Sequence, residues 1–219
     1  MENFTEKYNL KIFCDQFGQR VVQNYFDASE HRLISIFEKE MLKIRGSKDF
    51  YTMIELGSNQ AYYSCLFKAI LGKSNTKNIM VEPLDHYMQR GKYHFNINSY
   101  DGIFLDYCIG DQWGENGELF LGRLPTNTFN KVSKTLEQIM EEVNIQFLDV
   151  LHSDIDGSEH IMLTSSKNIF KNKMINSIFL LTHGADLNNR CKTFLLECGY
   201  NLIHEADNIG GDGLLVFEK

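Results

Sequence analysis

The sequence lacks several features that would point to particular classes of protein. Only 2 of its 219 residues are proline, so no proline-rich linker marks a domain boundary. Its 5 cysteines form neither a CxxC pair nor a zinc-ligand spacing, which is typical of a protein from a reducing cytoplasm. No apolar run approaches the roughly 20 residues of a membrane-spanning helix, and residues 1–7 lack the apolar core of a signal peptide. We therefore predict a cytoplasmic protein without a membrane span.

The sequence also has no excess of basic residues. Its 22 Lys and Arg residues face 29 Asp and Glu residues, which gives a net charge of -7 and a pI near 5.5. Binding to duplex phosphates requires a basic face, so we predict no nucleic-acid partner. A small phosphorylated substrate remains compatible with this charge, because it needs only a local basic pocket.

Two common nucleotide-binding motifs are missing. No GK[ST] sequence follows a glycine-rich turn, which excludes a P-loop. The turn Gly57-Ser58-Asn59-Gln60-Ala61 lacks two glycines of the GxGxxG dinucleotide fingerprint. A nicotinamide-dependent reductase is therefore only a distant alternative.

What the sequence does contain is a strand–turn–helix segment over residues 51–71. A short apolar strand is closed by Glu55, and Gly57 follows at a position where a side chain would block a ligand. Small polar residues then open a helix that runs through Cys65–Leu71. This order predicts a nucleotide-type site at the carboxyl edge of a parallel sheet, although an ordinary strand-to-helix turn would have the same pattern.

Strands and helices alternate along the rest of the chain, which predicts a mostly parallel sheet covered by helices on both faces. Residues up to about Lys48 show helical periodicity only. The last two predicted strands are joined by a glycine-bearing turn and should form an antiparallel hairpin. The later predicted strands are 78–81, 102–109, 147–153, 175–181, 201–205 and 213–217.

Polar residues follow the predicted strands, where the carboxyl ends should meet at one edge of the sheet. Glu82 directly follows the second strand, and its carboxylate can accept hydrogen bonds from two ribose hydroxyls. An acid there, beside an acidic first turn, favours a cationic nucleoside over a pyrophosphate. The full set at this edge is Glu55, Glu82, Asp111, Asp154, Asp156 and His183.

Three segments together resemble a known family. Residues 55–64 are similar to the first motif of S-adenosylmethionine-dependent methyltransferases, and Val81-Glu82-Pro83 is similar to the second. Residues 153–159, Ser-Asp-Ile-Asp-Gly-Ser-Glu, resemble the D-[IV]-E-G-x-E signature of FkbM-type methyltransferases. The resemblance implies a seven-stranded, mostly parallel Rossmann-like sheet with an antiparallel C-terminal hairpin. It implies a methyltransferase domain over 49–219, and the helical periodicity of the residues before it predicts an N-terminal helical cap segment over 1–48.

The resemblance also implies a set of contacts to S-adenosyl-L-methionine. Four residues of the first motif would hold the methionine end: Glu55, Gly57, Ser58 and Asn59. Glu82, with Pro83 beside it, would bind the ribose hydroxyls, and Asp154 would lie near the sulfonium and the acceptor. The adenine would be framed by Cys108, Ile109, Gly110 and Asp111. Three residues depart from the family pattern: Ala61 replaces a glycine, Asp156 replaces a glutamate, and His152 stands where a lysine is frequent.

Methyl transfer to an alcohol requires removal of the hydroxyl proton by a base within hydrogen-bond reach. We predict His183 as that base, with Asp154 and His152 as the next candidates; helix capping is the competing role for His183. Asp154, Asp156 and His183 could instead bind a metal, but carboxylates at this spacing also cap helices, so we predict no metal. Trp113, Tyr62 and Tyr63 could stack on a sugar, or pack in the core.

The prediction from the sequence is therefore an S-adenosylmethionine-dependent O-methyltransferase. Its acceptor would be a hydroxyl of a small molecule, such as a sugar or a sugar conjugate. The alternative from another class is a non-catalytic module that binds S-adenosylmethionine as an effector. Both predict cosubstrate binding, and only the first predicts turnover. The sequence leaves a homodimer open.

Overall fold

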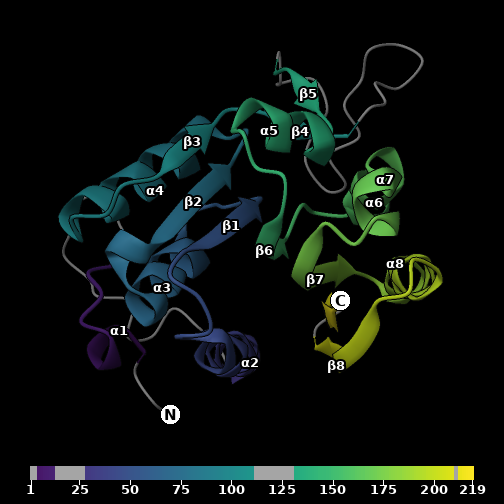
Figure 1. The fold of residues 1–219 in the computed structure, drawn as a ribbon, viewed down its shortest axis with the longest axis horizontal. Coiled ribbons are helices and arrows are strands. Elements are labelled where there is room, and N and C mark those ends of the chain that lie inside the picture. The colour runs from purple at the N-terminus through teal and green to yellow at the C-terminus, as the bar shows by residue number, and fades with distance from the viewer. Residues whose placement is uncertain (1–3, 13–27, 111–130, 210–211) are drawn as a thin grey trace. The chain divides into compact units, whose positions relative to one another are not determined.

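A computed structural model of the chain describes residues 4–12, 28–110, 131–209 and 212–219 (Figure 1). The chain divides into two compact units, Met1–Leu105 and Asp106–Lys219, and each is described by itself. Among the described residues, no helix is long and apolar enough to cross a membrane.

The first unit contains three parallel strands, with β1 pairing with β2 and β2 pairing with β3. Helix α3 packs against β1 and β2 and also contacts α2 and α4 (Figure 1). The elements are α1 (Phe4–Lys7), α2 (Ala28–Ile44), β1 (Tyr51–Leu56), α3 (Tyr62–Leu71), the 3₁₀ turn η1 (Lys73–Asn75), β2 (Thr76–Val81), α4 (Asp85–Ile97) and β3 (Ile103–Leu105).

The core of this unit follows from the continuous apolar runs of β1 and β2. Met53, Ile54, Ile79 and Met80 are all fully buried, so side chains on both faces of these strands are covered. A strand that is buried on both faces reads as an apolar run rather than as an alternating pattern. This is why the sequence located both strands, although β2 begins two residues earlier than predicted.

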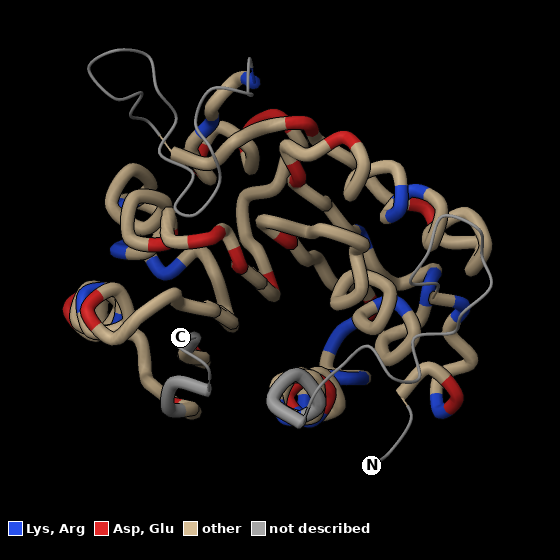
Figure 2. The backbone as a smooth tube through the Cα atoms, turned by 180° about the vertical axis from the view of Figure 1, so that it is seen from behind, with Lys and Arg blue, Asp and Glu red and all other residues tan. Residues whose placement is uncertain are grey.

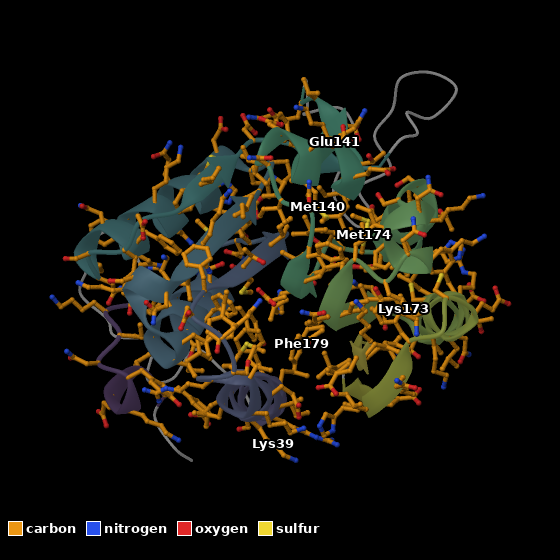
Figure 3. All side chains as sticks on the ribbon, viewed as in Figure 1. Lys39, Met140, Glu141, Lys173, Met174 and Phe179 are labelled. Carbon is orange, nitrogen blue, oxygen red and sulfur yellow. The ribbon has the colours of Figure 1, made fainter. Side chains whose placement is uncertain are left out.

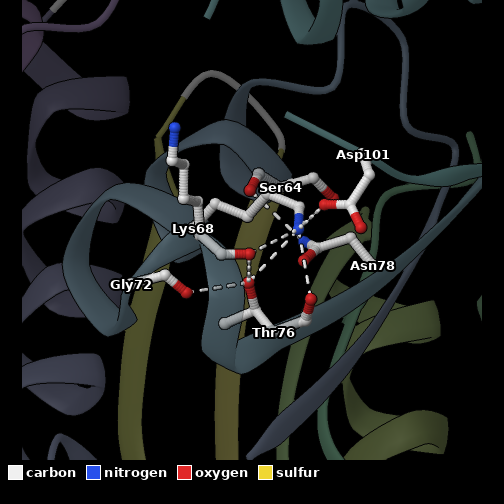
Figure 4. A network of polar contacts seen from close by, with 7 residues as sticks. Ser64, Lys68, Gly72, Thr76, Asn78 and Asp101 are labelled. Atoms are coloured by element: carbon white, nitrogen blue, oxygen red, sulfur yellow. Dashed lines mark hydrogen bonds and ion pairs between the residues drawn. The ribbon is translucent and has the colours of Figure 1, made fainter. Parts of the chain in front are cut away.

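A buried lysine near the end of α3 forms hydrogen bonds with the amino-terminal end of β2 (Figure 4). Lys68 is 1% exposed, and its Nζ donates to the Thr76 carbonyl oxygen at 3.1 Å and to the Thr76 hydroxyl at 3.3 Å. The same Nζ lies 2.9 Å from Asp101 Oδ1, just before β3. A buried ammonium group needs several acceptors to offset its desolvation, and this network supplies them.

The second unit contains parallel β6 and β7, followed by β9, which is antiparallel to both β7 and β8. Helix α8 packs against β7, β8 and β9, and α6 contacts α8 and β7 (Figure 1). The elements are β4 (Cys108–Ile109), β5 (Ser133–Lys134), α5 (Leu136–Glu142), β6 (Leu148–Ser153), α6 (Glu159–Ser165), α7 (Lys167–Lys171), β7 (Ile175–His183), α8 (Ala185–Glu197), β8 (Asn201–Ile209) and β9 (Asp212–Glu218).

The seven longer strands form one mostly parallel sheet in the order β3-β2-β1-β6-β7-β9-β8. The predicted fold class and the antiparallel C-terminal hairpin are therefore confirmed. One strand prediction was wrong in extent, because residues 102–109 do not form a single strand. Instead β3 ends at Leu105, and β4 forms a separate two-stranded sheet in which Cys108 pairs with Ser133.

Candidate functional site

The turn after β1 is held by its backbone against the end of β2. The N–H groups of Gly57 and Ser58 both donate to the Val81 carbonyl oxygen, at 2.9 Å and 3.1 Å. Three residues of the turn adopt left-handed backbone angles: Gly57 at φ 68, Asn59 at φ 46 and Ala61 at φ 58. A left-handed alanine costs roughly 1–2 kcal/mol, which explains why a glycine would suit position 61. The turn is consequently tight and presents its backbone toward the carboxyl edge of the sheet.

Glu82, the predicted ribose ligand, is fixed by backbone donors. Its Oε2 accepts from the Asn59 N–H at 2.8 Å, and its Oε1 accepts from the Leu84 N–H at 2.9 Å. The residue is 4% exposed. A carboxylate oxygen has two lone pairs and can accept more than one hydrogen bond, so this orientation is compatible with two ribose hydroxyls. The structure thus joins the first and second motifs through a single carboxylate.

Glu55 is directed toward helix α3. It is 2% exposed, and its Oε2 accepts from the Ser64 N–H at 3.1 Å, in the first turn of the helix. Burial, assisted by the charge of Glu82, raises the pKa of the Glu55 carboxyl to about 8. The group is therefore mostly protonated near pH 7. A cationic ammonium group beside it would favour its ionised form.

Ser58 is the one residue of this turn with an orphaned polar atom that could suit a ligand. The residue is 3% exposed, and its hydroxyl has no hydrogen-bond partner among the described residues. A buried hydroxyl without a partner is costly, and a bound polar ligand would offset that cost. This observation and the orientation of Glu82 both fit the predicted cosubstrate.

The predicted adenine-binding residues lie in the second unit. Gly110, at φ 135, follows β4; its carbonyl oxygen accepts from the Ser133 hydroxyl at 2.7 Å. A Cβ at Gly110 would lie 3.0 Å from Cγ2 of Ile161, so a side chain there would crowd helix α6. Cys108 is buried and Ile109 is half-buried. Asp111 and Trp113 lie outside the described residues.

Four ionisable side chains gather after β6 and β7 in the second unit. Nε2 of His183 lies 3.4 Å from Asp154 Oδ1 and 3.7 Å from Asp156 Oδ1. Nδ1 of the same ring lies 3.3 Å from Glu159 Oε1. We call Asp154, Asp156, Glu159 and His183 the His183 cluster. Parallel pairing of β6 with β7, with Ser153 opposite Leu180, brings these residues together from distant parts of the sequence.

Glu159 is a member of this cluster to which the sequence assigned no role. The residue is fully buried, and its Oε1 accepts from the N–H groups of Ile155 at 3.1 Å and Gly157 at 3.3 Å. Glu159 therefore shapes the turn between β6 and α6, in which Asp156 adopts φ 51. The signal was present in the sequence, because Glu159 is the final acid of the third motif.

His152, the third candidate base, has a different environment. It is 3% exposed, and burial lowers the pKa of its imidazole to about 3. The ring is therefore neutral across the physiological range and is a weak base. This environment suits a core residue of β6 better than a group that accepts a proton.

Two hollows in the structure lie away from these residues. One of about 660 Å³ lies at the amino ends of β2 and β3, where Thr76, Asp101 and Ile103 line it. Another of about 310 Å³ lies between α5 and the start of β7, where Met140 and Met174 line it (Figure 3). Ligands of open α/β sheets bind beyond the carboxyl ends of the strands, so we assign the site by its chemistry rather than by these hollows.

Three solved structures with the same fold are methyltransferases of low sequence identity to this chain. The METTL16 MTase domain has a TM-score of 0.58 and 13% identity, with 98% of this chain and 76% of that chain covered. Precorrin-6y C5,15-methyltransferase from Geobacter metallireducens GS-15 has a TM-score of 0.55 and 11% identity, with 95% and 97% covered. A methyltransferase from Pyrococcus furiosus has a TM-score of 0.53 and 15% identity, with 98% and 91% covered. At these identities the likeness shows the fold alone.

The sequence itself identifies the family. A comparison with curated proteins found no match. The model of the Methyltransferase FkbM domain, however, matches residues 49–202, which is well over half of the chain. The three motifs quoted above all fall within this range, and the strand order agrees with the fold that they predicted. The chain belongs to the FkbM methyltransferase family and is an S-adenosylmethionine-dependent methyltransferase.

Proposed function

We propose that the chain methylates a hydroxyl of a small, sugar-like acceptor. The observation that carries this proposal is the His183 cluster, in which an imidazole faces three carboxylates within 3.7 Å. A hydroxyl is a poor nucleophile until its proton is removed, and this cluster is suited to act on that proton. We propose Asp154 and His183 as the residues that do so, and we assign His152 to packing.

The cosubstrate contacts form the second part of the proposal. Glu82 would accept the ribose hydroxyls, while Glu55, Gly57, Ser58 and Asn59 would surround the methionine end. Pro83 would keep the chain extended after Glu82. The adenine pocket would include Cys108, Ile109, Gly110 and Asp111. Bound S-adenosylmethionine supplies an activated methyl group, and the residues named here would position it against the acceptor oxygen.

Charge distribution supports a small acceptor rather than a nucleic acid. The net charge is -7, and acidic and basic residues both occur in each unit of the described chain (Figure 2). A nucleic-acid methyltransferase requires basic surface along the phosphate path. A neutral sugar needs no such surface, because hydroxyl donors and acceptors recognise it.

The test is turnover of the full chain with S-adenosylmethionine against a panel of acceptors. The panel contains free sugars, sugar conjugates, small phenols and RNA, and the readout is S-adenosylhomocysteine together with the mass of the acceptor. We expect turnover with a hydroxylated sugar or its conjugate. Turnover with RNA alone would overturn the proposed acceptor class. Tight binding of S-adenosylhomocysteine without turnover on any member would favour the non-catalytic alternative.

A further inference from the structure

In the His183 cluster, the negative charges of the carboxylates are not offset by a neutral imidazole. Both ring nitrogens of His183 face carboxylate oxygens, Nε2 toward Asp154 at 3.4 Å and Nδ1 toward Glu159 at 3.3 Å. A neutral imidazole carries only one N–H, so it can donate to only one of these carboxylates. The other contact would bring two acceptors together, and either a second proton on the ring or a metal cation at the cluster would relieve that repulsion.

Glu159 gives independent support for a cation. The residue is fully buried, and although Oε1 accepts two backbone hydrogen bonds, Oε2 has no hydrogen-bond partner in the described part of the chain. A buried carboxylate oxygen without a donor is costly unless a positive charge lies close to it.

The distance between His183 and Asp154 is close to that between two ligands of one metal ion. Asp154, Glu159 and His183 can each supply one ligand atom, and these three atoms lie within 4.8 Å of one another. Two ligands about 2.1 Å from a metal and at right angles to each other lie about 3 Å apart, and two opposite ligands lie about 4.2 Å apart. The observed 3.4 Å between His183 Nε2 and Asp154 Oδ1 is close to the first value.

We propose that Asp154, Glu159 and His183 bind one divalent cation of the Mg²⁺ or Mn²⁺ type. Two carboxylates and one imidazole are ligands that Mn²⁺ accepts readily, and partly exposed Asp154 leaves room for water or a substrate oxygen. This replaces our prediction from the sequence that no metal is bound. In the proposed set of ligands, the buried Glu159 takes the place of Asp156, which the sequence had offered as a possible ligand.

The inference rests on the proposed function and specifies how the hydroxyl would lose its proton. An acceptor oxygen bound to the cation would have a lower pKa, so its O–H bond would break with release of the proton to solvent. The oxygen would then form a bond to the methyl carbon while the carbon–sulfur bond breaks, leaving a neutral thioether. Asp154 and His183 would thus act on this proton as ligands of the cation and not by accepting it, and Asp156 would remain an outer acidic neighbour.

The experiment measures binding of Mn²⁺ alone to the full chain after treatment with a chelator. Free Mn²⁺ is followed by electron paramagnetic resonance, without cosubstrate or acceptor. We expect one Mn²⁺ per chain, and Asp154→Asn or Glu159→Gln should weaken binding by about 100-fold or more, beyond the loss typical of an outer-shell partner. Asp186→Asn is the matched control, because the Asp186 side chain is 90% exposed on α8 and pairs with Arg190.

Three results would overturn the inference. The parent protein could bind no Mn²⁺, the Asp186→Asn variant could lose as much affinity as the cluster variants, or both cluster variants could bind as the parent does. Should Glu159→Gln fail to fold, as thermal unfolding would show, the partly exposed Asp154 still provides the test. Failure of the proposed function is distinguishable: it appears as bound Mn²⁺ and bound S-adenosylhomocysteine without methylation of any hydroxyl.

Discussion

The two units of the molecule hold their buried carboxylates in different ways. In the first unit, both oxygens of Glu82 accept backbone N–H groups, so the carboxylate is fixed and well hydrogen-bonded. In the second unit, only one oxygen of Glu159 has backbone donors, and the imidazole of His183 lies beside it. Backbone donors prepare a carboxylate to accept neutral hydroxyls, whereas an incompletely hydrogen-bonded carboxylate favours a proton or a metal ion. Under the proposed function, the ribose ligand lies in the first unit, and the groups that act on the acceptor proton lie in the second unit.

Among the predicted changes, removal of the His183 imidazole in the second unit should have the largest effect, and it should act on turnover. We expect His183→Ala to lower turnover by about 10²- to 10⁴-fold, the usual range for loss of a group that acts on the proton. Affinity for S-adenosylhomocysteine should stay within about threefold, since the proposed ribose ligand is in the other unit. Steady-state kinetics and calorimetry measure the two quantities.

The matched control is His204→Ala, a histidine of β8 outside the His183 cluster. Turnover of His183→Ala close to that of this control would contradict the catalytic role and leave His183 as a capping residue. Loss of cosubstrate binding together with turnover would contradict the proposed separation of binding from chemistry.

The turn of the first unit should be intolerant of a branched side chain. Gly57 has φ 68, where a valine is strained, and its side chain would occupy space next to the proposed ligand. We expect Gly57→Val to reduce affinity for S-adenosylhomocysteine by more than about 100-fold, or about 2.7 kcal/mol. Calorimetric titration measures the loss, and Gly46→Val, at φ 80 in open space, is the control for backbone strain alone. Normal binding by Gly57→Val would show that the site lies elsewhere.

Loss of the Glu82 carboxylate should have a smaller effect on the same quantity. We expect Glu82→Ala to weaken S-adenosylhomocysteine by about 10- to 100-fold, as is typical when a charged acceptor worth about 1.5–3 kcal/mol is removed. Turnover at saturating cosubstrate should change much less. Glu82→Gln retains one carbonyl acceptor and should lie between the parent and Glu82→Ala. An unchanged affinity in Glu82→Ala would remove the ribose assignment.

The smallest expected effect is a pH dependence caused by Glu55. Its pKa is raised from 4.5 to about 8 by burial, so between these values the folded chain holds a proton that the unfolded chain has released. The contribution of Glu55 to stability should therefore be fully present below about pH 4.5 and should decrease as the pH rises toward 8, by at most about 1.4 kcal/mol per pH unit. Urea unfolding at pH 6 and pH 7 should show this slope in the parent and a smaller slope in Glu55→Gln. Equal slopes would contradict the raised pKa.

Sequence alone located most elements of the fold because their signals are local. The apolar runs of β1 and β2 indicated strands buried on both faces. Gly199, at the end of α8, has φ 81, as expected of a residue that stops a helix. The single strand predicted over 102–109 failed because β4 depends on pairing with β5, more than twenty residues away. The strand propensity of residues 102–109 contains no information about a partner strand so far away in the sequence.

The residues of the site were also visible in the sequence, but their relations were not. The sequence placed Glu55, Glu82, Asp154 and His183 at strand ends, because an apolar strand followed by an acid or a histidine is a local pattern. Tertiary structure decided that Glu82 accepts from Asn59 and that Glu159 faces the ring of His183. Each of these pairs is separated by more than twenty residues in the sequence, and only the parallel pairing of neighbouring strands brings its members within hydrogen-bond distance.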